Sequence, residues 1–173
     1  MANDSGKVFR EVFETIIIAL VLAFLVRSFV VESFLVDGRS MEPTLYNNER
    51  LFVNKFGYRI SPPKRGDIIV FQYPKDTSRD FIKRVIALPG EEIEIKDQSV
   101  YIDGVLLEEP YVDKGDYEPH PKEEIPEGKL FVLGDNYGSS EDSRFFGPVP
   151  LKNVKGKALV VYWPVADLRI LQH

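Results

Sequence analysis

A β-strand that ends in a turn is predicted most clearly by the sequence Asp80-Phe-Ile-Lys-Arg-Val-Ile-Ala-Leu-Pro-Gly-Glu91. Side chains alternate between the two faces of a strand. One face is therefore expected to carry Phe81, Lys83 and Val85, and the opposite face takes the residues between them. Pro89-Gly90 then marks a turn. Lys83 shares its face with apolar neighbours, which makes it a candidate for a buried amine.

Short β-rich runs separated by turn residues continue in both directions from this strand. The candidate strands are residues 50–56, 67–73, 81–88, 92–95, 100–102, 129–133 and 158–163. Such spacing predicts a mostly β domain over residues 32–173, built as an antiparallel β-sheet or a partly closed barrel. Residues 92–128 are expected to include a hairpin and an exposed loop, because residues 111–127 are rich in proline and charge without an apolar period.

The N-terminal part of the chain contains an apolar segment. Counted over residues 12–31 it reaches about 20 residues, enough to cross a hydrocarbon core of about 30 Å. We therefore predict one transmembrane α-helix at 12–31, tethered to the β domain. Lys7 and Arg10 favour a short cytoplasmic N-terminus over residues 1–11. A cleaved secretory signal, for which no small-x-small site follows the segment, and a buried or interfacial helix stay open as alternatives.

The composition excludes several kinds of site. The 173 residues include no cysteine, which excludes thiol proteases, disulfide frameworks and cysteine-ligated zinc. Of the two histidines, His120 lies in a proline-rich run and His173 is the last residue, so neither promises the rigid histidine of a Ser-His-Asp triad. The net charge is −5 and no basic run is present, so nucleic acid is not an expected partner. No metal or cofactor is expected.

A serine close to a glycine is the candidate nucleophile, in the sequence Gly38-Arg-Ser-Met-Glu-Pro-Thr-Leu45. A serine hydroxyl is a weak nucleophile until a neighbouring base removes its proton. Without a suitable histidine, a lysine is the available strong base. Lys83 is the candidate, because burial among apolar groups can lower a lysine pKa from about 10.4 toward neutrality. An exposed lysine on a strand edge is the competing interpretation, which alternation alone does not exclude.

Four segments, in order along the chain, resemble the sequence boxes of bacterial type I signal peptidases. These are Ser40-Met-Glu-Pro-Thr-Leu45, Arg65-Gly-Asp-Ile-Ile-Val-Phe71, Lys83-Arg-Val-Ile-Ala-Leu-Pro-Gly-Glu91 and Gly134-Asp-Asn-Tyr-Gly-Ser-Ser-Glu-Asp-Ser-Arg144. They follow an N-terminal apolar segment, as in that family, and the likeness covers nearly the whole chain. The short length and single anchor look most like the Gram-positive, Bacillus-type members.

The resemblance implies a Ser-Lys serine endopeptidase in which Ser40 is the acylated nucleophile and Lys83 is its base. It places Met41 beside the substrate pocket and makes Ser140 the hydroxyl that orients the lysine amine. The charged residues that would support the site are Arg84, Asp135, Asp142 and Arg144. Gly38 stands where some members have a serine that completes the oxyanion hole. Backbone N–H groups, including that of Ser40, are therefore expected to fill this role.

The position of the serine predicts the kind of substrate. Ser40 lies nine residues beyond Val31, so the connection reaches at most about 30 Å from the end of the apolar segment. The expected substrates are secretory preproteins, whose signal peptides carry small residues at −1 and −3. Small residues need shallow pockets, for which Met41 and Phe81 or Ile82 are candidate floors. The peptide is expected to bind extended, as an added strand, at the outer face of the cytoplasmic membrane with the lipid bilayer as a second partner.

Two other functions stay open. A self-cleaving Ser-Lys protein of the repressor type would share the β architecture, but it would carry a DNA-binding domain where this chain has an apolar segment. A non-catalytic, membrane-anchored β module that binds exported chains would need neither Ser40 nor Lys83.

Overall fold

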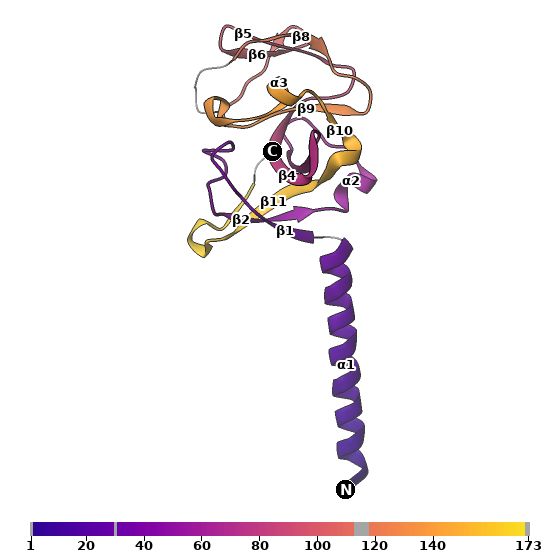
Figure 1. Cartoon of the computed structure of the whole chain (residues 1–173). Coiled ribbons are helices and arrows are strands. Elements are labelled where there is room, and N and C mark those ends of the chain that lie inside the picture. The colour runs from indigo at the N-terminus through magenta and orange to yellow at the C-terminus, as the bar shows by residue number, and fades with distance from the viewer. Residues whose placement is uncertain (1, 30, 113–117, 172–173) are drawn as a thin grey trace.

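The computed structural model describes residues 2–29, 31–112 and 118–171, and the side chains of residues 2–5 and 23–29 lie outside that description. One long N-terminal helix and two antiparallel β-sheets make up the described chain (Figure 1). The mostly β, antiparallel fold predicted from the sequence is confirmed.

The N-terminal helix, α1 (Ala2–Phe29), leads away from the sheets (Figure 1). It starts before the predicted 12–31 and ends earlier, because Val31 already belongs to strand β1 (Val31–Leu35). The large apolar side chains described between Val8 and Leu22 are all exposed. Among the residues whose side chains are described, no helix has both the length and the apolarity needed to cross a membrane. Residues 23–30 of the predicted span lie outside that set.

The larger sheet has eight strands and is open, with β1 at one end and β10 (Val149–Pro150) at the other. Its order is β1-β2-β11-β3-β4-β9-β10, and β12 (Arg169–Ile170) pairs with β11. The strands between the ends are β2 (Arg50–Asn54), β11 (Val154–Trp163), β3 (Ile68–Tyr73), β4 (Asp76–Ala87) and β9 (Lys129–Leu133). Of the two predicted forms the structure therefore has the sheet, because the barrel does not close.

The smaller sheet has four strands in the order β7-β6-β5-β8. Their bounds are β7 (Val105–Leu106), β6 (Ser99–Ile102), β5 (Glu92–Lys96) and β8 (His120–Glu124). The hairpin of β5 and β6 matches two predicted strands. The expected loop at 111–127 is wrong for residues 120–124, because they form β8 and pair with β5 in an antiparallel register. Residues 113–117 of that expected loop lie outside the described residues. The proline-rich and charged sequence of β8 has no alternating pattern, so this strand owes its place to pairing at a sheet edge.

The centre of the larger sheet is buried on both faces. Successive residues of β3 enter different apolar clusters: Ile68 and Val70 pack with Leu45 and Leu51, whereas Ile69 and Phe71 pack on the opposite face. A third cluster fills the space between β4, β9 and the smaller sheet. The remaining short elements are α2 (Gly57–Ile60), α3 (Ser143–Phe146) and the 3₁₀ turns η1 (Tyr137–Ser139), η2 (Leu151–Asn153) and η3 (Val165–Asp167). Strand β4 therefore has a neighbouring strand on each edge and an apolar cluster on each face.

A buried carboxylate at the start of β3 ties three elements together. Asp67 accepts hydrogen bonds from Lys157 Nζ at 2.6 Å, from the Lys64 backbone N–H at 2.9 Å and from the Tyr58 hydroxyl at 3.0 Å. Burial alone would raise the pKa of Asp67, but these hydrogen bonds and the Lys157 charge outweigh it and lower the pKa below its ordinary value. The contact joins α2 and β11 to the entry of β3.

Replacing Asp67 with asparagine is expected to lower the free energy of unfolding at pH 7 by about 2 kcal/mol, because a charged acceptor of three donors is lost. A carboxyl group whose pKa is lowered by folding stabilises fully above its unfolded pKa. That stabilisation is lost as the pH falls through the folded value. The difference between the two proteins should therefore shrink below about pH 4. Urea denaturation at several pH values measures it, and equal stabilities at pH 7 would contradict this role.

Candidate active site

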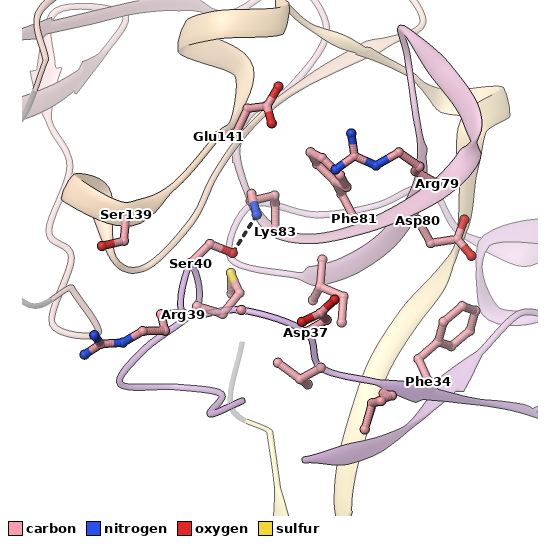
Figure 2. A pocket seen from close by; sticks show the side chains of 15 residues that line it. Phe34, Asp37, Arg39, Ser40, Arg79, Asp80, Phe81, Lys83, Ser139 and Glu141 are labelled. Atoms are coloured by element: carbon pink, nitrogen blue, oxygen red, sulfur yellow. Dashed lines mark hydrogen bonds between the residues drawn. The ribbon is translucent and has the colours of Figure 1, made fainter. Parts of the chain in front are cut away.

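A cavity of about 470 Å³ lies where three segments distant in the sequence meet (Figure 2). Residues 34–41 from β1 and the turn after it form one wall, residues 79–83 of β4 form another, and Ser139 and Glu141 complete the lining. The predicted nucleophile, base and pocket residues all lie in this lining: Ser40, Lys83, Met41, Phe81 and Ile82. Folding therefore brings together residues that the sequence separates by some forty positions.

Ser40 is held by its backbone. Its carbonyl accepts a hydrogen bond from the Asn136 N–H at 3.0 Å, and a helical turn starts just after it, with Leu45 N–H bonded to the Met41 carbonyl at 2.8 Å. Among the described residues, the Ser40 N–H donates to no other group. The side chain is thus directed from a fixed backbone, with one free N–H beside it.

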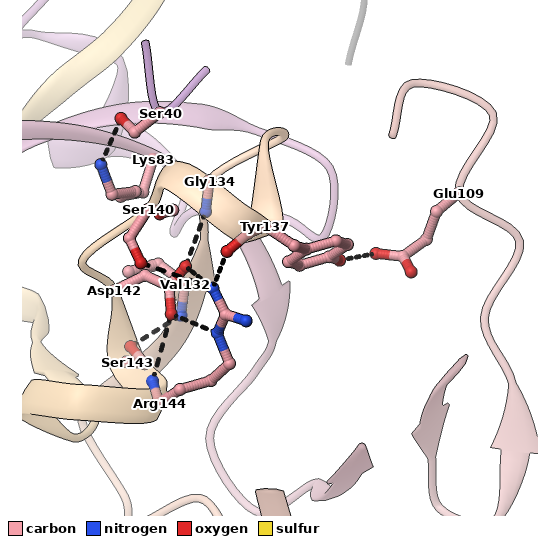
Figure 3. A network of polar contacts seen from close by, with 10 residues as sticks. All are labelled: Ser40, Lys83, Glu109, Val132, Gly134, Tyr137, Ser140, Asp142, Ser143 and Arg144. Carbon is pink, nitrogen blue, oxygen red and sulfur yellow. Dashed lines mark hydrogen bonds and ion pairs between the residues drawn. The ribbon is translucent and has the colours of Figure 1, made fainter. Parts of the chain in front are cut away.

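Lys83 reaches Ser40 from the middle of β4. Its Nζ lies 2.7 Å from Ser40 Oγ, and only 4% of the residue is exposed (Figures 2 and 3). Lys83 is paired with Ile69 of β3, and the pairing of β4 with β9 begins at the next residue, Arg84. A charged amine donates to the serine oxygen in this geometry, whereas a neutral amine can accept the serine proton.

Burial lowers the pKa of Lys83 from 10.5 to about 8. The cause is desolvation of the ammonium, which is opposed by the carboxylates of Asp142, Glu141 and Asp135. A substantial fraction of the amine is therefore neutral near pH 8, as a general base requires.

Ser140 does not make the predicted hydrogen bond to the lysine. Its hydroxyl is buried and has no hydrogen-bond partner within the described part of the chain. The Lys83 amine instead points at Ser40. Ser140 nevertheless lies close to Ser40, because the Ser140 side chain and the Ser40 carbonyl both crowd Gly134.

Two buried ion pairs brace this region. Arg84, the residue after the lysine, forms a two-point contact with Asp135, with Nε–Oδ1 at 2.9 Å and Nη2–Oδ2 at 2.7 Å. Asp135 also accepts the Thr44 hydroxyl, and the Arg84 guanidinium lies 3.9 Å from the centre of the Tyr111 ring. Asp135 thus binds both Thr44, in the turn that carries Ser40, and Arg84, on the strand that carries Lys83.

The second ion pair folds the segment after β9. Asp142 caps α3 by accepting from the Arg144 N–H, and its carboxylate contacts the Arg144 side chain at 2.8 and 2.9 Å (Figure 3). It also accepts the Gly134 N–H at 3.2 Å. Arg144 in turn donates to the Tyr137 carbonyl at 2.8 Å. These bonds set the path on which Gly134, Ser140 and Glu141 lie.

Gly134 has no room for a side chain. A Cβ at this position would collide with the Ser40 carbonyl and with the Ser140 side chain. The absence of a side chain at Gly134 therefore allows residues 134–144 to approach the turn that carries Ser40. Glycine is required here for lack of space and not for an unusual backbone angle. Gly38, in contrast, has φ +99 and open space around it, and it offers no side-chain donor.

Sequence reasoning missed several residues that shape the site. Thr44, Gly134 and Asn136 lie inside the quoted boxes, so their identities were visible, but their contacts with Asp135 and Ser40 depend on how the boxes meet. Glu141 also lies inside a quoted box, but nothing in the box indicates its contact with Tyr73, which carried no local signal of its own. Among the described residues, no group of three or more histidine, aspartate or glutamate side chains could hold a metal ion.

Comparisons with known proteins converge on one family. A family model described as "Signal peptidase, peptidase S26" matches residues 9–163. The chain is 44% identical over 166 residues to "Signal peptidase I" of Leptolyngbya laminosa, covering 91% of this chain and 81% of the relative. It is 35% identical over 181 residues to "Signal peptidase IB" of Staphylococcus aureus (strain COL), covering 92% and 94%.

A solved structure agrees with these matches. The crystal structure of a signal peptidase I from Enterococcus faecalis V583 superposes with a TM-score of 0.50 and 38% identity, over 55% of this chain and 95% of that one. Because the relatives include a cyanobacterial protein, the comparisons support the family and do not single out the Gram-positive group suggested by the sequence.

Replacing Lys83 with methionine is expected to raise the free energy of unfolding by about 1–3 kcal/mol below pH 8, because a charged amine is no longer buried. The unfolded chain keeps the Lys83 proton up to about pH 10.5, whereas the folded chain releases it near pH 8. Wild-type stability should therefore rise relative to the variant as the pH increases between these values. Denaturant titrations at pH 7 and 9.5 test this, and a pH-independent difference would contradict burial of the amine.

Replacing Gly134 with alanine is expected to reduce activity at least about 100-fold and to destabilise the fold by about 1–3 kcal/mol, because the Ser40 carbonyl must move. Gly138→Ala is the matched control, since a Cβ there meets nothing within 4 Å. Activity and thermal unfolding of both variants measure the effect. Similar behaviour of the two would show that the close approach is unimportant.

Proposed function

The chain belongs to the signal peptidase family, peptidase S26, and we propose from this membership that it is a serine endopeptidase that removes signal peptides from precursor proteins. The observation that carries the proposal is the 2.7 Å contact between a buried Lys83 amine and the Ser40 hydroxyl on the wall of a peptide-sized cavity. The mechanism, the substrate contacts and the anchoring that follow are parts of this proposal.

In the first chemical step, neutral Lys83 accepts the proton of Ser40 while Oγ attacks the scissile carbonyl carbon. The resulting oxyanion is stabilised by the Ser40 N–H, which is free among the described residues. The ammonium of Lys83 then gives its proton to the leaving amine as the peptide bond breaks. A water molecule attacks the carbonyl carbon of the acyl-enzyme while Lys83 takes a proton from that water. Lys83 then gives this proton to Ser40 Oγ as the ester bond breaks, which releases the carboxylic acid product and restores the neutral amine.

Support residues keep this pair in place. The buried Ser140 hydroxyl makes no hydrogen bond within the described residues, so it is available to orient the amine when Lys83 swings from Ser40 to the leaving group. Arg84 and Asp135 hold the lysine strand to the serine turn, and Asp142 and Arg144 hold the segment that carries Ser140. These four are positioning residues.

The substrate binds as an extended strand between residues 34–38 and 79–83. Among the described strands β1 pairs with β2 alone, so its other edge is available for an added strand. Met41, Phe81 and Ile82 line the cavity close to Ser40 and leave space for small side chains, which agrees with small residues at −1 and −3 of a signal peptide.

Helix α1 acts as the membrane anchor in this proposal. Its exposed side chains from Ile16 to Leu22 are all apolar and cover about two helical turns, which is unfavourable in water. Strand β1 begins two residues after the helix ends, so the cavity stays near the surface of the bilayer. Precursors held in the same membrane would present their cleavage sites at this height, outside the cytoplasm.

The test is cleavage of a preprotein by the full chain in detergent micelles. Ser40→Ala and Lys83→Ala should each lower kcat/KM by about 10³-fold or more, while Lys152→Ala, which changes an exposed lysine, should not. Because only the neutral amine is a base, wild-type kcat/KM should rise with pH through about 8 and then level off. Retained cleavage by Lys83→Ala would refute the mechanism.

A further inference from the structure

Glu141 is an acidic side chain on the wall of the cavity that the mechanism does not use. It lies between two buried residues, Ser140 and Asp142, and is itself exposed. The alternation directs it into the same cavity as Ser40 and Lys83 (Figure 2). A carboxylate at this place is close enough to the reacting groups to affect both the substrate and the base.

The carboxylate is held in a defined position. The Tyr73 hydroxyl donates to Glu141 Oε1 at 2.8 Å. Tyr73 is only 7% exposed, and its ring stacks on Phe81 at 4.6 Å and meets the edge of Phe146 at 5.4 Å. Because the ring cannot move easily, its hydroxyl fixes the carboxylate before any substrate binds.

The cavity surroundings carry many other charges. The charged groups in its lining are Asp37 and Arg39 after β1 and Arg79, Asp80 and Lys83 on β4. Asp135 and Asp142 after β9 are buried behind the lining and act on Lys83 electrostatically. Most of the acids and one base are already paired, namely Asp80 with Lys155, Arg39 with Glu42, Asp135 with Arg84, and Asp142 with Arg144. Arg79 lies over the rings of Tyr73 and Phe81, 5.5 and 5.1 Å from their centres.

Within the described part of the chain, no ion pair joins Glu141 to a cation, although the Arg79 guanidinium lies over the ring of Tyr73, whose hydroxyl donates to Glu141. Asp37 has none either, but it also lacks a hydrogen bond that would fix it. Glu141 is therefore a fixed carboxylate without an ion-pair partner among the described residues, on the wall of the cavity that Ser40 also lines. Such a group attracts a cation that enters the cavity, and the entering molecule is the substrate peptide.

We propose that Glu141 is a specificity-determining residue that binds a lysine or arginine side chain of the precursor next to the scissile bond. The inference rests on the proposed function, since it needs a peptide bound across Ser40. In an extended peptide, side chains alternate between the two sides. One substrate position close to the cleaved bond must then face this wall of the cavity.

The ion pair also has a consequence for the base. Glu141 is one of the carboxylates that hold the pKa of Lys83 up against the effect of burial. A substrate cation that neutralises Glu141 removes part of the effect that keeps the pKa of Lys83 up. Lys83 then favours its neutral form when a basic substrate is bound, so the preferred substrate itself promotes the catalytic state of the base.

The experiment uses the full chain in micelles and one signal-peptide sequence with small residues at −1 and −3. Lysine, glutamine or glutamate is placed in turn at −2, +1 and +2. At one of these positions, kcat/KM should be about two- to fivefold higher for lysine than for glutamine, and lower again for glutamate. The preference should weaken at high salt, because an exposed ion pair is screened.

Three variants separate a substrate contact from a structural role. Glu141→Gln should abolish the preference for lysine and move the rise of kcat/KM to lower pH, because a carboxylate near Lys83 is lost. Tyr73→Phe keeps the charge and the ring stacking, so it should weaken the preference and leave the pH profile in place. Glu108→Gln, which removes an exposed carboxylate outside the cavity lining, should change neither.

Two outcomes overturn the inference while leaving the proposed function intact. One is equal cleavage of all the charge variants by the wild type, and the other is a lysine preference that persists in Glu141→Gln. If the wild type cleaves none of the peptides, including the unmodified sequence, the proposed function itself fails, and this assignment with it.

Discussion

A lysine amine kept out of water against a serine hydroxyl is the constraint on which the rest of this structure depends. Desolvation of an ammonium is costly, and here it lowers the pKa of Lys83 to about 8. The cost is sustained because Lys83 lies on β4, in the centre of the larger sheet, where apolar clusters pack on both faces. A lysine on a frayed edge would turn into solvent and regain its ordinary pKa.

The charged residues around this pair are arranged so that most of them satisfy one another. Asp135 is paired with Arg84 and Asp142 with Arg144, so the carboxylates near Lys83 raise its pKa only partly. The same ion pairs connect the serine turn, the lysine strand and the segment after β9. Breaking one partner would leave a buried charge uncompensated, which is far more costly than the pair is stabilising. Glu141 differs because it is exposed and has no such partner among the described residues, which leaves it available to a ligand.

Much of the β architecture could be predicted from alternation and turn residues. The strands at 67–73, 81–88, 92–95, 100–102 and 129–133 lie within a few residues of β3, β4, β5, β6 and β9. Strands β1 and β8 were missed for opposite reasons. The apolar start of β1 continues the pattern of the helix before it, and β8 has no apolar pattern because only pairing with β5 forms it. The hydrogen bond expected between Ser140 and Lys83 is absent, since side-chain direction is not encoded in a motif.

Local sequence made Ser40 and Lys83 candidates, because a chain without cysteine and without a well-placed histidine leaves few ways to activate a serine. The resemblance of four segments to the boxes of type I signal peptidases then selected them over an exposed serine and lysine. The tertiary structure determined whether Ser40 Oγ and Lys83 Nζ come into contact. The distance of 2.7 Å arises from the sheet register, from the Asn136 hydrogen bond to Ser40 and from the missing side chain at Gly134. Only packing determines how much water reaches an amine, so the pKa of Lys83 and the unpaired state of Glu141 follow from the fold and not from the order of residues.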